Sequence, residues 1–181
     1  MNTKEHLIKA ALSFSIILSW GSANATSLGR IERGVIVNID RNPAICVPKD
    51  ARETMPVGWI SITESYVRNA ESWALELKLN AKPLVLKPGD CIIYGLIPNG
   101  YEYPKYKQKV KNLSFKENRT YSFQINHAYR LTDVYKAIFC TSQTEDGPLV
   151  YIQYTRSPDG REVIPFCDAR LNGNVPKQLW P

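Results

Sequence analysis

Four cysteines and one histidine are the side chains beyond residue 25 that are best suited to chemistry. The histidine is His127, and the cysteines are Cys46, Cys91, Cys140 and Cys167. No two of these cysteines form a Cys-x-x-Cys pair, the spacing that zinc sites usually contain. Only one histidine could complete a set of zinc ligands. We therefore interpret the cysteines as two disulfides, and we expect no metal and no cofactor.

Three pairings of four cysteines are possible. We favour Cys46 with Cys91 and Cys140 with Cys167, because each bridge then ties one half of the chain to itself. The second bridge carries a geometric condition, since its cysteines fall on the first and third predicted strands of a meander. If another strand lay between them, their Cα atoms would be about 9.6 Å apart, which exceeds the reach of a disulfide, about 7 Å.

Catalysis by His127 would need a nucleophile or an orienting carboxylate nearby, and no nucleophile motif surrounds it. We interpret it as a surface or strand-end histidine. Two carboxylate pairs, Glu64 with Glu71 and Glu145 with Asp146, could in principle act as acid and base, but they lie in polar, turn-like stretches where solvated charges are common. The sequence predicts a protein that is not an enzyme.

The first 25 residues have the pattern of a Sec signal peptide. Lys4 and Lys9 precede an apolar run over residues 10–20, and Ala23-Asn24-Ala25 matches the small-residue site that signal peptidase cuts after. We expect a soluble periplasmic chain that begins at Thr26 and forms one domain over residues 26–181. No cysteine stands at the cleavage point to carry lipid, and we expect no membrane anchor. The net charge of +6 is mildly basic, and an exported chain is not expected to bind nucleic acid.

Alternating apolar and polar residues predict strands along most of the chain, and no segment shows a helical period. The clearest alternation places Trp73, Leu75, Leu77 and Leu79 on one face. We predict an all-β fold, an antiparallel immunoglobulin-like β-sandwich stabilised by disulfides. The predicted strands cover residues 35–39, 44–47, 59–67, 72–79, 84–86, 91–94, 121–125, 134–141, 149–154 and 161–166, with a loop over 48–56 that could hold one helical turn.

Residues 82–95 predict a corner between two of these strands. Pro88-Gly89 is typical of a turn with positive φ at its third residue, and it lies between Leu86 and Cys91, which belong to the two flanking strands. The cysteine would anchor the corner covalently.

Four lysines recur at every second position of one segment, Lys105, Lys107, Lys109 and Lys111, beside Tyr101, Tyr103 and Tyr106. If the segment is extended, the lysines point the same way. They could protect a sheet edge from aggregation. Alternatively, the tyrosines supply contact area and the lysines attract an acidic protein partner, which would make these seven residues the binding surface.

Residues 42–47, the aromatic strand at Trp73 and above all residues 83–95 resemble a family of small exported bacterial proteins, the immunity proteins of the type VI secretion system. Members share an early Cys-Val strand and a later Leu-x-Pro-Gly-x-Cys-hydrophobic-x-Tyr-Gly segment, here Cys46-Val47 and residues 86–95. The resemblance covers roughly residues 35–103. Many members resemble lipoproteins, and this chain differs in lacking the lipid-bearing cysteine.

The resemblance implies a periplasmic protein that binds and neutralises a toxin delivered by another cell. Two alternatives come from other classes. The chain could be a structural or adhesive β-sandwich, such as a pilus-like subunit or its helper, or it could be a periplasmic ligand-binding or inhibitor module.

Overall fold

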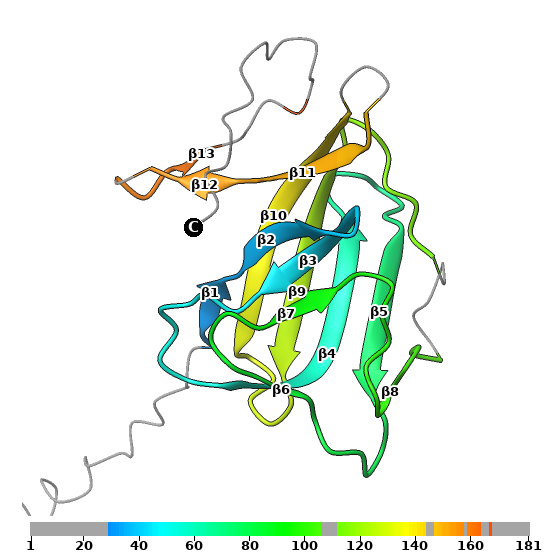
Figure 1. The fold of residues 1–181 in the computed structure, drawn as a ribbon, viewed down its shortest axis with the longest axis vertical. Coiled ribbons are helices and arrows are strands. Elements are labelled where there is room, and N and C mark those ends of the chain that lie inside the picture. Colours follow the sequence, from blue (N-terminus) through cyan, green and yellow to red (C-terminus); the bar gives the residue numbers. More distant parts are fainter. Residues whose placement is uncertain (1–28, 106–111, 144–146, 158, 164–166, 168–181) are drawn as a thin grey trace, which may run out of the picture.

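The computed structural model describes residues 29–105, 112–143, 147–157, 159–163 and 167 (Figure 1). This part of the chain is entirely β and contains no helix, as predicted. It therefore contains no helix long and apolar enough to cross a membrane. The predicted signal peptide lies outside the described residues. So do Tyr106 and three of the four lysines of the predicted binding surface, Lys107, Lys109 and Lys111.

Two sheets form the body of the protein. The large sheet has the order β1-β10-β9-β4-β5-β8, with β11 also paired to β10 and β6 to β4, and the small sheet has the order β2-β3-β7. Every pairing is antiparallel except that of β1 with β10. The strands are β1 (Ile31–Arg33), β2 (Val35–Ile39), β3 (Asn42–Cys46), β4 (Met55–Glu64), β5 (Ser72–Leu77), β6 (Val85–Leu86), β7 (Cys91–Ile93), β8 (Tyr101–Glu102), β9 (Thr120–His127), β10 (Val134–Gln143), β11 (Leu149–Gln153), β12 (Thr155–Arg156) and β13 (Glu162–Val163).

The small sheet lies in front of the large sheet in Figure 1, and one core fills the space between them. Ile45 and Ile92 enter this core from the small sheet, while Ile62 and Phe123 enter it from the large sheet. Phe115, which lies in neither sheet, makes edge contacts with the rings of Tyr94, Tyr121 and Tyr151 at centroid distances of 5.0 to 5.4 Å. The segment before β9 therefore contributes to the core although it is not a strand.

The chain passes directly from one sheet to the other at Gly34, between β1 and β2. The Gly34 amide still donates to Lys136 O in the large sheet at 3.0 Å. A Cβ atom at this position would come within 2.7 Å of Ile45 Cδ1 in the core. Glycine is thus required here by the close approach of the small sheet.

The second passage is the corner that the sequence predicts at Pro88-Gly89. Here β6, paired with β4, leads into β7, paired with β3. Gly89 has a φ of +90°, and the Asp90 amide donates to Lys87 O at 2.9 Å, which closes the turn. The predicted turn is confirmed. The covalent anchor is also present, because Cys46 and Cys91 are opposite one another in β3 and β7 and form a disulfide.

Cys140 and Cys167 are bonded as well, with a Cα–Cα distance of 5.9 Å. Within the predicted strand at 161–166, the described residues form β13, which pairs with β12 rather than extending the meander, and 164–166 lie outside the described residues. The distance of 5.9 Å is within the reach of a disulfide, so the geometric condition on this bridge is met.

Several strands differ from the prediction, and the following differences show how pairing across the sheet overrides the local pattern. β4 begins at Met55, within the predicted loop, because its first residues pair with β6. β5 ends at Leu77, so Leu79 is exposed instead of completing the apolar face. β1 is not among the predicted strands, yet it pairs in parallel with β10.

Gln153 on β11 joins the outer edge of the small sheet to the large sheet. Its side-chain amide accepts from Ile36 N at 2.8 Å and donates to Gly34 O at 2.7 Å. The side chain thus substitutes for a peptide group of a neighbouring strand. It satisfies two backbone groups at the edge of β2, where a further strand would otherwise be needed.

We predict that Gln153→Ala lowers the free energy of unfolding by about 2 to 4 kcal/mol, because it leaves these two backbone groups without partners. Gln143→Ala is the matched control, since Gln143 is exposed and its amide makes one hydrogen bond, to Gly147 O. We expect the control to cost less than about 0.5 kcal/mol. Urea unfolding with both disulfides intact measures the difference, and equal losses for the two variants would contradict the bridging role.

Candidate functional site

The first candidate is the predicted tyrosine and lysine surface, and the structure removes Tyr101 from it. Tyr101 is only 3% exposed. Its hydroxyl donates to Val57 O at 2.6 Å and accepts from Leu84 N at 3.1 Å, and burial raises its pKa. Sequence alternation could not reveal this, because β8 is only two residues long and its inward face is set by pairing with β5. Tyr101 holds the core together and offers almost no surface to a partner.

The rest of this surface is attached to the core at both ends. On the near side Tyr103 packs against the core, Pro104 is buried and Lys105 is exposed. On the far side Leu113 is buried, and its carbonyl accepts a hydrogen bond from the Tyr94 hydroxyl at 2.7 Å. The remaining predicted residues, Tyr106, Lys107, Lys109 and Lys111, lie outside the described residues. The described residues on both sides of 106–111 are therefore attached to the core.

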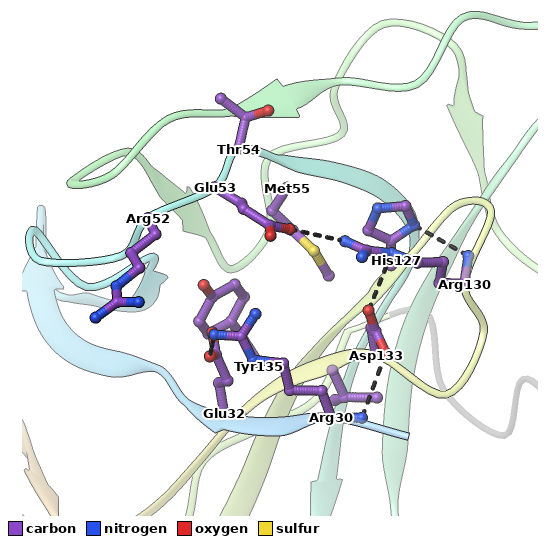
Figure 2. Close-up of a pocket in the computed structure, with 11 residues that line it drawn as sticks. Arg30, Glu32, Arg52, Glu53, Thr54, Met55, His127, Arg130, Asp133 and Tyr135 are labelled. Atoms are coloured by element: carbon purple, nitrogen blue, oxygen red, sulfur yellow. Dashed lines mark hydrogen bonds and ion pairs between the residues drawn. The ribbon is translucent and has the colours of Figure 1, made fainter. Parts of the chain in front are cut away.

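The second candidate is a charged hollow that the sequence analysis did not predict. Figure 2 shows side chains from β1, the loop before β4, the end of β9 and the start of β10 gathered around it. Its charged members come from positions up to a hundred residues apart, which is why no local pattern indicates it. Three are basic and three acidic, namely Arg30, Arg52, Arg130, Glu32, Glu53 and Asp133.

Ion pairs join most of the basic and acidic groups of the hollow. Arg130 lies between two carboxylates, 3.2 Å from Glu53 Oε2 and 3.0 Å from Asp133 Oδ2 (Figure 2). Arg30 pairs with Glu32, and its backbone amide donates to Asp133 Oδ1 at 3.3 Å. These contacts connect β1, the loop before β4 and the turn between β9 and β10.

His127 was predicted to lie on the surface or at the end of a strand. It lies at the end of β9, but it is buried. Its Nδ1 accepts hydrogen bonds from the backbone amides of Tyr129 and Arg130, both at 3.0 Å. The ring is therefore neutral, with its proton on Nε2. Burial, with a smaller effect from Arg130, lowers the pKa of His127, while Asp133 and Glu53 act in the opposite direction. In this state His127 fixes the turn at residues 128–133.

The hollow has a volume of about 30 Å³, which is room for about one or two water molecules. Small-molecule sites are usually about ten times larger or more. In the part of the chain that the structure describes, no group of three or more histidine, cysteine or acidic side chains is placed to hold a metal ion. The side chains of the hollow hold the turn at residues 128–133 in place. The outer side of this turn carries Tyr129 and Leu131, which are both exposed.

The chain matches no protein-family model, no curated protein and no solved structure. The arrangement of the residues must therefore support any functional proposal.

We predict that the turn at residues 128–133 loosens in acid. The folded pKa of His127 is lower than the unfolded value of about 6.5, so the unfolded state binds the proton more readily. The stability that the neutral ring contributes is then complete above about pH 6.5 and is lost as the pH falls through the folded pKa. Protonation at Nδ1 would break both hydrogen bonds to the turn.

Hydrogen-exchange protection factors for the Tyr129 and Arg130 amides, measured between pH 7.5 and pH 5, test this prediction. We expect them to fall relative to the amide of Ile125, which lies within β9. In His127→Gln the pH dependence should disappear, because the only other histidine, His6, lies in the predicted leader. Parallel behaviour of the turn and Ile125 amides in the parent would show that His127 does not control the turn.

Proposed function

We propose that this chain is a periplasmic immunity protein that binds and neutralises a protein toxin delivered by a type VI secretion system. It acts by contact and not by catalysis. The Cys46-Val47 strand and the Leu-x-Pro-Gly-x-Cys corner support this proposal, because they are the motifs of the family that the sequence resembles. In the fold they form one unit, since the corner and the strand are paired and bonded through Cys46 and Cys91.

The observation that carries the proposal is the attachment of the basic segment to a rigid body. Tyr103 and Pro104 on one side and Leu113 and Phe115 on the other tie its ends to the core. Ends that are already fixed reduce the conformational entropy lost on binding. Lysines at alternate positions would speed association with an acidic partner.

Export and location are part of the proposal. Two disulfides favour an oxidising compartment, and the leader pattern indicates Sec export. We propose a soluble chain with no lipid anchor and no nucleic-acid partner. The immunoglobulin-like character of the sandwich belongs to this proposal too, and two facing sheets with Trp73 in the core support it.

The alternative functions receive less support. A pilus-like subunit needs an open strand position that a donated strand can fill. At the edge of β2, however, Gln153 already satisfies Ile36 N and Gly34 O. A ligand-binding module needs a pocket larger than the hollow of about 30 Å³ around His127.

We predict that changing Lys105, Lys107, Lys109 and Lys111 to serine slows association with the toxin about tenfold at low salt, because the attraction to an acidic surface is lost. The toxin to use is the product of the neighbouring gene, purified as an inactive variant. The control changes four exposed lysines elsewhere, Lys49, Lys78, Lys82 and Lys87, which alters the net charge equally.

Stopped-flow association rates at several salt concentrations distinguish the outcomes. The parent and the control should associate at similar rates, and the rates of both should fall as salt is added. If the variant with serine at positions 105, 107, 109 and 111 associates as fast as the parent at low salt, and its melting temperature is unchanged, the lysines only protect a sheet edge from aggregation.

A further inference from the structure

The turn between β9 and β10 presents large apolar side chains to solvent. Tyr129 is 72% exposed and Leu131 is 76% exposed. Exposed Ile31 and Val85 lie on either side of it, on β1 and β6. Backbone contacts establish this proximity. Val134 N donates to Arg30 O at 2.8 Å, and Ala128 N donates to the carbonyl of Pro56, which pairs with Val85, at 2.8 Å.

The turn is located at one end of the body, with β1 on one side and β6 on the other (Figure 1). Single exposed apolar residues are ordinary on protein surfaces. Two of them on one turn, with two more on strands beside it, mark a candidate interaction site. Tyr129 also belongs to one of the residue types that dominate binding energies.

The turn is held from the inside, which leaves its outer side free. His127 Nδ1 accepts from two of its amides, and the His127 amide donates to Asp133 O at 2.9 Å. The Asp133 amide donates to Arg130 O at 2.8 Å, and the Arg130 side chain is held by Glu53 and Asp133. A turn fixed in this way loses little conformational entropy when it binds.

The charges behind the turn indicate what the partner surface must be. Three basic and three acidic side chains line the hollow, so their formal charges cancel, and ion pairs join Arg30 to Glu32 and Arg130 to Glu53 and Asp133. The turn therefore presents apolar side chains without a net local charge. Its counterpart needs no compensating charge, in contrast with the acidic surface that suits the lysine segment.

We propose that the turn at residues 128–133, with Ile31 and Val85 beside it, is a second contact region for the toxin, and that it places Tyr129 and Leu131 in an uncharged apolar recess of that protein. This inference rests on the proposed immunity function and specifies a binding surface for it. A convex, rigid turn with outward apolar side chains fits a concave surface. The lysine segment accelerates the encounter, and the turn slows dissociation.

The test compares two double variants that contain the same substitutions. Tyr129→Ser with Leu131→Ser alters the turn, whereas Tyr66→Ser with Leu79→Ser alters residues that are 79% and 91% exposed elsewhere. We expect the turn variant to weaken toxin binding about 30-fold or more, mainly through faster dissociation. The control should stay within about twofold of the parent. The loss should be the same at low and high salt, because no charge is removed.

A third variant, Tyr129→Phe with Leu131→Met, retains the apolar side chains and should bind nearly as well as the parent. Protection of the Tyr129 and Arg130 amides should be unchanged in all variants, which separates lost contact from an altered turn. If the parent binds the toxin and the serine variant of the turn binds equally well, or if both serine variants lose affinity equally, the inference is overturned and the proposed function stands. If the parent neither binds nor neutralises the toxin, the proposed function fails and this inference fails with it.

Discussion

Burial of the inner face of the small sheet against the large sheet is the constraint on which the rest of the structure depends. A sheet with one apolar face must bury that face against another layer of secondary structure. The chain meets this requirement with connections at several points of the small sheet. β1 of the large sheet continues into β2 of the small sheet at Gly34, and the Pro88-Gly89 corner leads from β6 of the large sheet to β7 of the small sheet. Gln153 on β11 joins the outer edge of β2 to the large sheet. The Cys46–Cys91 bridge then fixes β3 to β7.

These connections leave the two candidate binding regions on a rigid body. The described residues that flank the basic segment pack against the core, and among them Phe115 contacts the rings of Tyr94, Tyr121 and Tyr151. The turn after β9 is held by His127, by an ion pair from Arg130 to Glu53 in the loop before β4, and by a hydrogen bond from the Arg30 amide, next to β1, to Asp133. The two regions differ chemically, one being basic and the other apolar without net charge. In the proposed function they have separate tasks, since long-range attraction sets the association rate and desolvated apolar contacts set the lifetime of the complex.

Local signals were sufficient for part of the fold. A Pro-Gly pair between two alternating runs specifies its own turn, so the corner at Gly89 could be predicted from adjacent residues. An even cysteine count in a chain with a predicted leader indicated bridges. Features that arise from distant pairing could not be predicted in this way. They include the parallel partner of β1, the inward side of Tyr101 in a two-residue strand, and the charged hollow, in which Glu53 meets Arg130. The burial of His127 belongs to the same group, because it depends on elements that pack together only in the folded chain.

The central claim is that the chain neutralises a toxin by binding it in the periplasm. The most direct measurement is survival of cells that express the neighbouring toxin with a periplasmic export signal, combined with light-scattering mass analysis of the purified mixture. We predict that the parent chain protects only when it is exported, and that it forms a complex of fixed stoichiometry with the toxin. Failure to protect, or protection by the exported chain without any complex, would contradict the claim.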